Sequence, residues 1–123
     1  MYKISLIIPV YNAEKYLRDL LESIINQTMD YRQIQVIMVD DFSKDNSRDI
    51  MDEYAKKYDN FISEKLPQNN RFAGTARNRG MELAEGEFLM FADADDFLPE
   101  SACQTMYDAI NLKNADFIIG NYI

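Results

Sequence analysis

Short apolar runs that alternate with helical patterns limit the fold of this chain more than any other feature of its sequence. A short apolar run bounded by Pro or polar residues is typical of a buried strand, whereas apolar residues three and four positions apart are typical of a helix. Strands that alternate with helices predict an α/β fold, in which a mainly parallel sheet carries helices on both faces. The expected strands cover residues 4–8, 35–39, 61–66, 88–92 and 117–119.

Helices are expected between these strands. The first should have Asn12 as its N-cap, and the second should follow the polar segment 43–47. The third should begin near Thr75 and end before Gly86, and the fourth should carry Pro99 in its first turn. All of this fits one domain over residues 1–123. The buried face of the first helix is expected at Tyr16, Leu17, Leu20, Leu21, Ile24 and Ile25.

The chain is acidic, with 21 Asp and Glu residues, 13 Lys and Arg residues and a net charge of −8. Binding to nucleic acid depends on a basic surface, so this composition argues against a nucleic-acid partner. It does not argue against a nucleotide, because a metal ion and a few Arg side chains are enough to hold a diphosphate.

Residue types and segments that are missing from the sequence exclude several classes of protein. There is no histidine, so Ser-His-Asp or Cys-His catalysis and a His-ligated metal are excluded within this chain. The single cysteine, Cys103, cannot form an internal disulfide, which fits a reducing cytosol. Neither a signal-peptide pattern nor an apolar run of about 18 residues occurs. The expected location is the cytoplasm, which includes the inner face of the membrane for a peripherally bound protein.

Acidic residues follow two of the expected strands. Asp40 and Asp41 come after the second strand, and Asp93, Asp95 and Asp96 come after the fourth. Parallel strands end at one edge of their sheet, where ligands bind, so these acids are expected to gather there. Two carboxylates about 4 Å apart repel by roughly 4 kcal/mol at an effective dielectric constant near 20. Protonation, basic partners or a metal ion must therefore relieve the cluster.

Asp93 and Asp95 are the expected ligands of a divalent metal ion. They are two positions apart, so their side chains would point the same way in an extended strand end. Hard oxygen ligands suit Mn²⁺ or Mg²⁺ and leave coordination positions open for phosphate oxygens. In the simpler alternative, Asp93, Asp95 and Asp96 form a solvated turn that caps the next helix.

Two further residues near the strand ends are candidates for nucleotide binding. Asp41 could accept hydrogen bonds from a ribose or a base, and its alternative role is to cap the helix that follows. Tyr11 could stack on a base, and its alternative place is the core.

A third candidate is the basic segment 70–80, which contains Arg71, Arg77 and Arg79. It runs from a Gly-containing loop into the start of a helix, an arrangement that favours anions, and Arg adds a forked donor for phosphate. The alternative is a solvated helix face on which these side chains pair with Glu82 and Glu85. Gly80 allows close packing or the close approach of a ligand.

Five motifs together resemble the inverting glycosyltransferases of family two, which have the GT-A fold. Their order and spacing both fit the family, and they cover essentially the whole chain. They are IIPVYN at 7–12, VDDFSKDNS at 39–47, GTARNRG at 74–80, AEGEF at 84–88 and FADADD at 91–96.

The resemblance implies the transfer of a sugar, with inversion, from a nucleotide sugar, typically linked to UDP, to a glycan or cell-surface polymer. Pro9 and Tyr11 would line the nucleoside pocket, and Asp41 would bind the base, typically uracil. Asp93 would lie by the ribose and the metal, and Asp95 would be the main metal ligand. Arg71 and Arg77 would lie near the base or the diphosphate.

Two parts of the family's active site have no counterpart in the sequence. The catalytic base, an acid, and a further metal ligand, often His, belong to a later segment in this family. Residues 1–123 are therefore expected to be the N-terminal part of a longer enzyme, which binds the donor and by itself lacks efficient transfer.

Three other functions are alternatives to this one. A Mg²⁺-dependent phosphohydrolase would carry its Asp-x-Asp after the first strand, where this chain has Pro9. A receiver domain would carry paired acids after the first strand and a Lys after the last. A module that only binds nucleotide sugars remains the third alternative.

Overall fold

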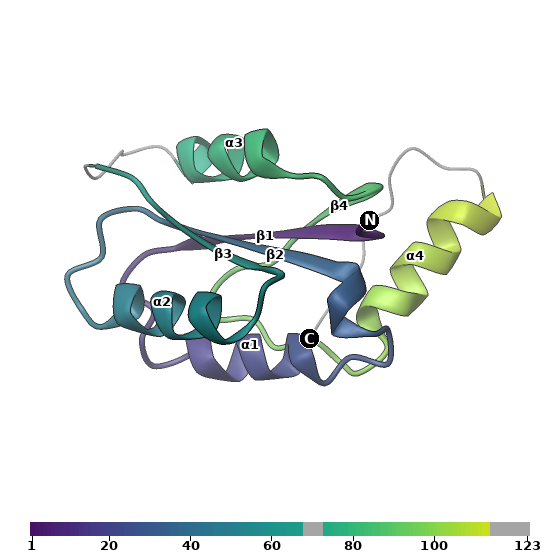
Figure 1. Ribbon diagram of the computed structural model, residues 1–123, viewed down its shortest axis with the longest axis horizontal. Helices are drawn as coiled ribbons and strands as arrows, with labels where there is room; N and C mark the ends of the chain where they lie inside the picture. Colours follow the sequence, from purple (N-terminus) through teal and green to yellow (C-terminus); the bar gives the residue numbers. More distant parts are fainter. Residues whose placement is uncertain (68–72, 114–123) are drawn as a thin grey trace.

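The computed structural model describes residues 1–67 and 73–113, and within them the strands form one parallel sheet (Figure 1). The sheet has four strands in the order β3-β2-β1-β4. Every neighbouring pair is parallel, and β1 pairs with β2 along its whole length. The α/β prediction is confirmed. The strands are β1 (Ile4–Val10), β2 (Ile34–Asp40), β3 (Phe61–Lys65) and β4 (Phe88–Phe91).

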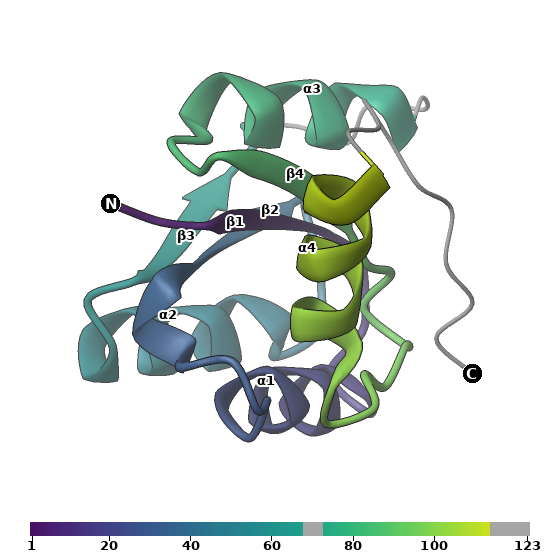
Figure 2. The same cartoon turned by 90° about the vertical axis from the view of Figure 1, so that its right-hand side faces the viewer.

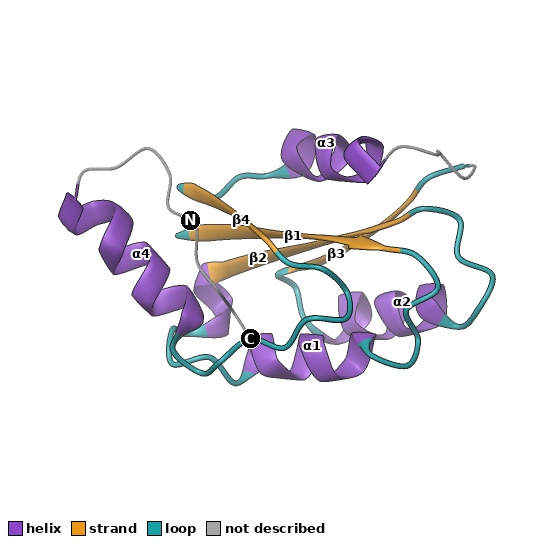
Figure 3. Ribbon diagram, turned by 180° about the vertical axis from the view of Figure 1, so that it is seen from behind, coloured by secondary structure: helices purple, strands orange, loops and turns teal. Residues whose placement is uncertain are grey.

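Helices cover both faces of the sheet, as the sequence predicts. In Figure 1 the helices α1 and α2 lie below the sheet and α3 lies above it, and Figure 2 shows the same layers from the side. The fourth helix, α4, lies at the end of the molecule where the strands begin, opposite their carboxyl ends (Figure 3). None of the described helices is long and apolar enough to cross a membrane. The bounds are α1 (Leu17–Ile25), α2 (Ser47–Lys57), α3 (Ala73–Leu83) and α4 (Ala102–Lys113), with a short 3-10 helix at Tyr31–Gln33.

The two central strands, β1 and β2, divide their side chains between two apolar clusters, because successive side chains of a strand point to opposite faces. Leu6 and Ile8 belong to the larger cluster, together with Leu20 of α1. Ile7 belongs to the smaller cluster, together with Ala76 of α3. All seven residues of β2 are buried, as expected for a central strand with helices on both faces.

Helix α3 lies very close to the sheet at Gly80. A Cβ atom at this position would lie 2.4 Å from Cγ2 of Ile7, which is fully buried. Of the two roles that the sequence suggests for Gly80, the structure therefore shows close packing.

The structure corrects the expected end of the first strand. The strand does not stop before Pro9 but continues to Val10. Pairing with β4 ends at Ile7, whose carbonyl accepts a hydrogen bond from Ala92. The backbone groups of Pro9, like those of Ile7, point toward β4, but the pairing with β4 has already ended at this position. No hydrogen bond to a partner strand therefore needs the N–H that proline lacks.

Three expectations for the helices are also wrong. Asn12 does not cap α1, which begins at Leu17, because its side chain instead accepts a hydrogen bond from the N–H of Lys44 at 2.8 Å. Tyr16 is 53% exposed and does not belong to the buried face. Pro99 precedes α4, and its carbonyl accepts a hydrogen bond from the N–H of Ala102. The expected strand at 117–119 lies outside the described residues.

Candidate functional site

The loops after β1, β2 and β4 lie at the carboxyl edge of the sheet, where the sequence predicts the site. Tyr11 follows β1, Asp41 follows β2, and the acidic segment 93–96 follows β4. Because β1 lies between β2 and β4 in the sheet, Tyr11 lies between the other two sites. Tyr11 is 49% exposed, so it is available to a ligand rather than part of the core. Pro9 and Asp41 are half-buried, and the Asp41 N–H donates to the carbonyl of Val10 at 2.8 Å.

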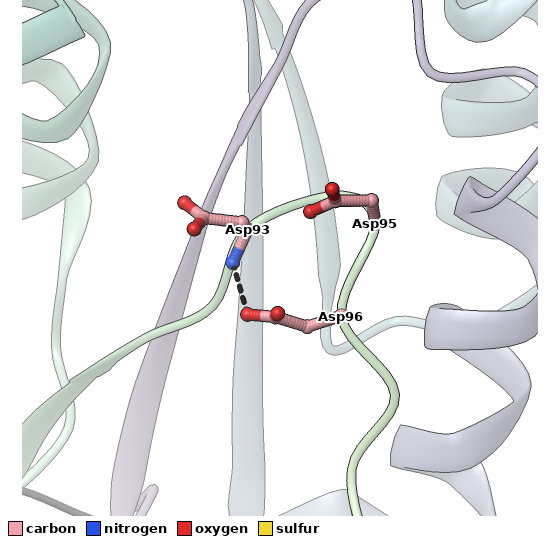
Figure 4. Close-up of side chains that lie close together, drawn as sticks. All are labelled: Asp93, Asp95 and Asp96. Atoms are coloured by element: carbon pink, nitrogen blue, oxygen red, sulfur yellow. Dashed lines mark hydrogen bonds between the residues drawn. The ribbon is translucent and has the colours of Figure 1, made fainter. Parts of the chain in front are cut away.

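Asp93, Asp95 and Asp96 form a compact acidic turn after β4. Each offers a carboxylate oxygen, and these oxygens lie within 4.8 Å of one another. The Asp93 N–H donates to a carboxylate oxygen of Asp96 at 2.8 Å, and the Asp96 N–H donates to the Asp93 carbonyl at 2.9 Å. Figure 4 shows the side chains of Asp95 and Asp96 pointing across the turn toward Asp93.

Asp93 and Asp95 lie close together, as expected, but in a turn and not at an extended strand end. β4 ends at Phe91, so Asp93 and Asp95 are not side chains of an extended strand end. The turn brings them together instead, through the two hydrogen bonds between Asp93 and Asp96. It does not cap the next helix, because α4 begins only at Ala102.

The donor set of the acidic turn fits a divalent cation. Its oxygens are hard ligands, and the side chains of Asp93 and Asp95 are exposed, which leaves room for further ligands from a substrate. The Arg77 guanidinium lies 3.6 Å from Asp93 and supplies part of the positive charge that relieves the repulsion. A divalent ion would relieve more of it.

Asp40 does not join this group, which corrects the expectation that all the acids gather together. Its side chain is fully buried, and the carboxylate accepts hydrogen bonds from Arg48 Nε at 2.5 Å and from the Ser43 N–H at 3.0 Å. A basic partner therefore relieves the charge of Asp40, and Asp41 is the acid of this pair that lies toward the surface.

The three Arg residues of the basic segment 70–80 differ in position and in partners. Arg71 lies outside the described residues. Arg77 lies on α3 beside the acidic turn, in keeping with a role near a diphosphate. Arg79 pairs with Glu64 at 2.5 Å and with Glu82 at 2.8 Å, so the alternative of a paired helix face holds for this residue.

Four hydrogen bonds join the loop after β1 to the loop after β2 and the first residue of α2, and we call this set the loop ladder. Asn12 and Phe42, one in each loop, have positive φ angles of 47° and 65°. Residues other than glycine rarely adopt these left-handed conformations, so the surrounding contacts must hold both loops in place. The bonds run from Asn12 N to Ser43 Oγ (2.9 Å), Ala13 N to Ser47 Oγ (2.9 Å), Glu14 N to Asp45 Oδ2 (3.1 Å) and Lys44 N to Asn12 Oδ1 (2.8 Å).

The loop ladder predicts a pH-dependent contribution to stability from Asp45. Burial alone would raise the pKa of the Asp45 carboxyl, but the hydrogen bonds that it accepts from Ser47 and Glu14 hold the pKa below its usual range. A lowered pKa stabilises the fold above the unfolded-state pKa of about 3.9, and this stability is lost as the pH falls through the folded-state pKa. Asp45→Ala should lower the free energy of unfolding by about 1 kcal/mol at pH 7.

Urea denaturation from pH 7 down to about pH 3 tests this contribution. The difference in the free energy of unfolding between wild type and Asp45→Ala should become smaller below about pH 4. The variant Asp108→Ala removes an exposed acid from α4 and serves as the control. A difference for Asp45→Ala that stays constant over the whole range would contradict the assignment.

A cleft of about 540 Å³ lies between α1 and the segment that joins the acidic turn to α4. Its lining includes Asp19, Glu22, Phe97 and Glu100, and none of the predicted site residues. The nucleotide site is therefore assigned from the strand ends and not from this cleft.

A family model described as Glycosyl transferase family 2 matches residues 5–123. The chain belongs to this family. The five motifs that suggested the resemblance all lie within the matched region. Family 2 membership is incompatible with the receiver and phosphohydrolase alternatives.

Similar proteins include glycosyltransferases, one of which is a poly(ribitol-phosphate) beta-glucosyltransferase. The chain is 40% identical over 119 residues to Glycosyltransferase GlyG of Streptococcus pneumoniae. This match covers 97% of this chain and 38% of that protein. It is 37% identical over 118 residues to the poly(ribitol-phosphate) beta-glucosyltransferase of Bacillus spizizenii. That match covers 96% of this chain and 19% of the relative. The chain thus spans well under half the length of either relative.

A solved glycosyltransferase structure has the same fold. The crystal structure of S. aureus TarS in complex with UDP is similar with a TM-score of 0.85 and 34% identity, over 93% of this chain and 33% of that chain. The complex of TarS with UDP-GlcNAc gives a TM-score of 0.86. The strand order and the helices on both faces of the sheet are those of a GT-A, Rossmann-like fold.

Proposed function

We propose that this chain is the donor-binding part of an inverting, metal-dependent glycosyltransferase that takes its sugar from a UDP sugar. The observation that carries the proposal is that Tyr11, Asp41 and the acidic turn share one edge of the sheet. An aromatic ring and a hydrogen-bond acceptor suit a nucleoside, and an acidic turn suits the metal ion of a diphosphate. The similar protein TarS, whose structure contains UDP-GlcNAc, supports a UDP sugar as donor.

Within this proposal the nucleoside lies over the end of β1. Pro9 and Tyr11 line the pocket, and Asp41 accepts a hydrogen bond from the uracil. Arg71 and Arg77 lie near the base or the diphosphate. Asp93 and Asp95 hold Mn²⁺ or Mg²⁺, and the bound ion would supply positive charge to the diphosphate that leaves. Asp93 also lies beside the ribose.

The acceptor in the proposal is a glycan or a cell-surface polymer. The Bacillus spizizenii relative, a poly(ribitol-phosphate) beta-glucosyltransferase, supports a polymer of this kind. None of the described acids at the carboxyl edge is proposed as the catalytic base, which on the family pattern belongs to a later segment. We place the site in the cytoplasm, including the inner face of the membrane, where a polymer acceptor is accessible.

Replacement of Asp41 should separate its proposed role in binding from a role in folding. Asp41→Ala is expected to weaken the binding of UDP about tenfold to a hundredfold, the effect of one lost hydrogen bond to a charged group. The binding of UDP should be weakened more than the folding of the chain. Calorimetric titration with UDP and Mn²⁺, together with thermal unfolding, measures both. Asp49→Ala, which removes an exposed acid from α2, is the matched control.

Asp41 does not cap the helix that follows, because α2 begins at Ser47 with Asn46 as its N-cap. The alternative that remains is a role of Asp41 in the fold of its own loop, and it predicts a different result. In that case the loss of binding and the loss of melting temperature would have a common cause, and both would be large. A normal UDP affinity in Asp41→Ala would contradict the proposed contact with the base.

The alternative of a module that only binds nucleotide sugars is tested by activity. A UDP sugar and a poly(ribitol-phosphate) acceptor are incubated with this chain and, separately, with the longer protein that contains it. The proposal expects release of UDP only from the longer protein. Binding without release of UDP from either protein would favour the binding-only function.

A further inference from the structure

Arg48, near the start of α2, contacts three segments at the carboxyl edge of the sheet. Its Nε donates to the buried carboxylate of Asp40 at the end of β2, at 2.5 Å. Its Nη2 donates to the carbonyl of Leu66, just after β3, at 3.2 Å. Its guanidinium carbon lies 5.4 Å from the centroid of the Phe42 ring, in the loop after β2. Because a guanidinium is planar and forked, it can make these contacts at the same time.

The carboxylate of Asp40 depends on this cation. Asp40 is fully buried, and its Oδ1 has no hydrogen-bond partner among the described residues. The other oxygen, Oδ2, accepts both from Arg48 and from the Ser43 N–H. A buried carboxylate without a cationic partner is strongly unfavourable, so Arg48 keeps Asp40 in the position where it also fixes Ser43.

Asp41 lies between residues that Arg48 holds. Asp40 precedes it and pairs with Arg48, and Phe42 follows it and lies against the guanidinium. Phe42 has a positive φ of 65°, a conformation that a bulky side chain adopts only when its surroundings impose it. The backbone direction at Asp41 therefore follows from contacts that Arg48 makes on both sides.

The loop ladder connects Asp40 and Ser43, which Arg48 helps to hold in place, to the loop after β1. Ser43, which Asp40 holds through its N–H, accepts a hydrogen bond from the Asn12 N–H through its hydroxyl. Asn12 directly follows Tyr11. Contacts from Arg48 thus lead to both side chains that are proposed to bind the nucleoside, although Arg48 itself belongs to α2.

We propose that Arg48 is a positioning residue for recognition of the base, because it fixes Asp41 and Tyr11 relative to each other. This inference rests on the proposed function, in which those two residues bind uridine. It predicts that changes at Arg48 reduce the preference for uracil over another base. Contacts to the diphosphate, which depend on the acidic turn, should stay intact.

The test compares the affinities of UDP and CDP by calorimetric titration in the presence of Mn²⁺. The two ligands share ribose and diphosphate, so their ratio reports on the base alone. Arg48→Lys keeps the charge but loses the fork, and Arg48→Gln loses both. We expect each variant to lower the preference for UDP over CDP about tenfold, the value of one hydrogen bond, while CDP binding changes little.

Two further variants separate positioning from general stability. Arg18→Gln is the matched control, because Arg18 forms a forked pair with Glu53 between α1 and α2, at 2.6 and 2.8 Å, and is expected to keep the wild-type preference. Phe42→Leu removes the ring beside the guanidinium at a residue that is 38% exposed, so folding should tolerate it. This variant should also lower the preference and keeps the test possible if Arg48→Gln fails to fold.

The possible outcomes separate the positioning role from the proposed function. A wild-type preference for UDP that is unchanged in Arg48→Lys and Phe42→Leu would overturn the positioning role alone. An equal loss of UDP and CDP affinity would also overturn it, because that result indicates a general loss of structure. A wild-type chain that binds neither nucleotide in the presence of Mn²⁺ would overturn the proposed function itself.

Discussion

Asp95→Asn should weaken the binding of UDP in the presence of Mn²⁺ by about a hundredfold or more. The substitution keeps the size of the side chain but removes a charged oxygen ligand, and a metal ion contributes several kcal/mol to holding a diphosphate. The fold should be unaffected, because Asp95 is exposed and lies in a turn that hydrogen bonds between Asp93 and Asp96 hold. Titration of UDP into the variant with and without Mn²⁺ measures the effect.

A matched control removes the same charge elsewhere. Asp108→Asn changes an exposed acid on α4, at the end of the molecule opposite the carboxyl edge of the sheet, and should keep the wild-type affinity (Figure 3). If Asp95→Asn bound UDP as tightly as this control does, the acidic turn would not be the metal site.

The second large effect is expected from Gly80→Ala, which should lower the free energy of unfolding by about 1–3 kcal/mol. The new methyl group would lie 2.4 Å from Cγ2 of Ile7, a buried and branched side chain that has little room to move. To relieve this contact α3 must move away from the sheet. That movement would also shift Arg77 from Asp93, so a loss of UDP affinity should accompany the loss of stability.

Gly74→Ala is the control for this prediction, because it makes the same change in the same helix. A Cβ at Gly74 would meet nothing within 4 Å, so the substitution should be neutral or stabilise the chain by up to about 1 kcal/mol. Urea denaturation of both variants measures the difference. Equal stability of the two variants would contradict the close packing of α3 on β1.

Asp40 and Asp41 show why part of the site could be predicted from sequence and part could not. Both acids follow an apolar run, and that pattern placed them at the carboxyl edge of the sheet. Their different environments depend on β2 extending one residue further than expected, to Asp40. Asp40 then shares the face of Val36 and Met38, which α2 covers and where Arg48 provides its partner. The alternation of side chains in a longer strand would have predicted this burial.

Residues whose roles depend on distant partners were the least predictable. The identity of Asn12 suited a helix cap, but its partners, Ser43 and Lys44, are more than thirty positions away in the sequence. Arg48 gave no signal at all, since an Arg in the first turn of a helix has no distinctive pattern. The grouping of Asp93 and Asp95 was predicted, whereas the turn that produces it depends on hydrogen bonds with Asp96 that spacing alone does not specify.

A divalent ion that joins the acidic turn to the diphosphate should make the binding of nucleotides depend on Mn²⁺. UDP and uridine are each titrated into the wild-type chain with Mn²⁺ and with EDTA. We predict that Mn²⁺ strengthens the binding of UDP by about a hundredfold or more and leaves the binding of uridine, which has no diphosphate, unchanged. An affinity for UDP that is the same in Mn²⁺ and in EDTA would contradict this role of the metal ion.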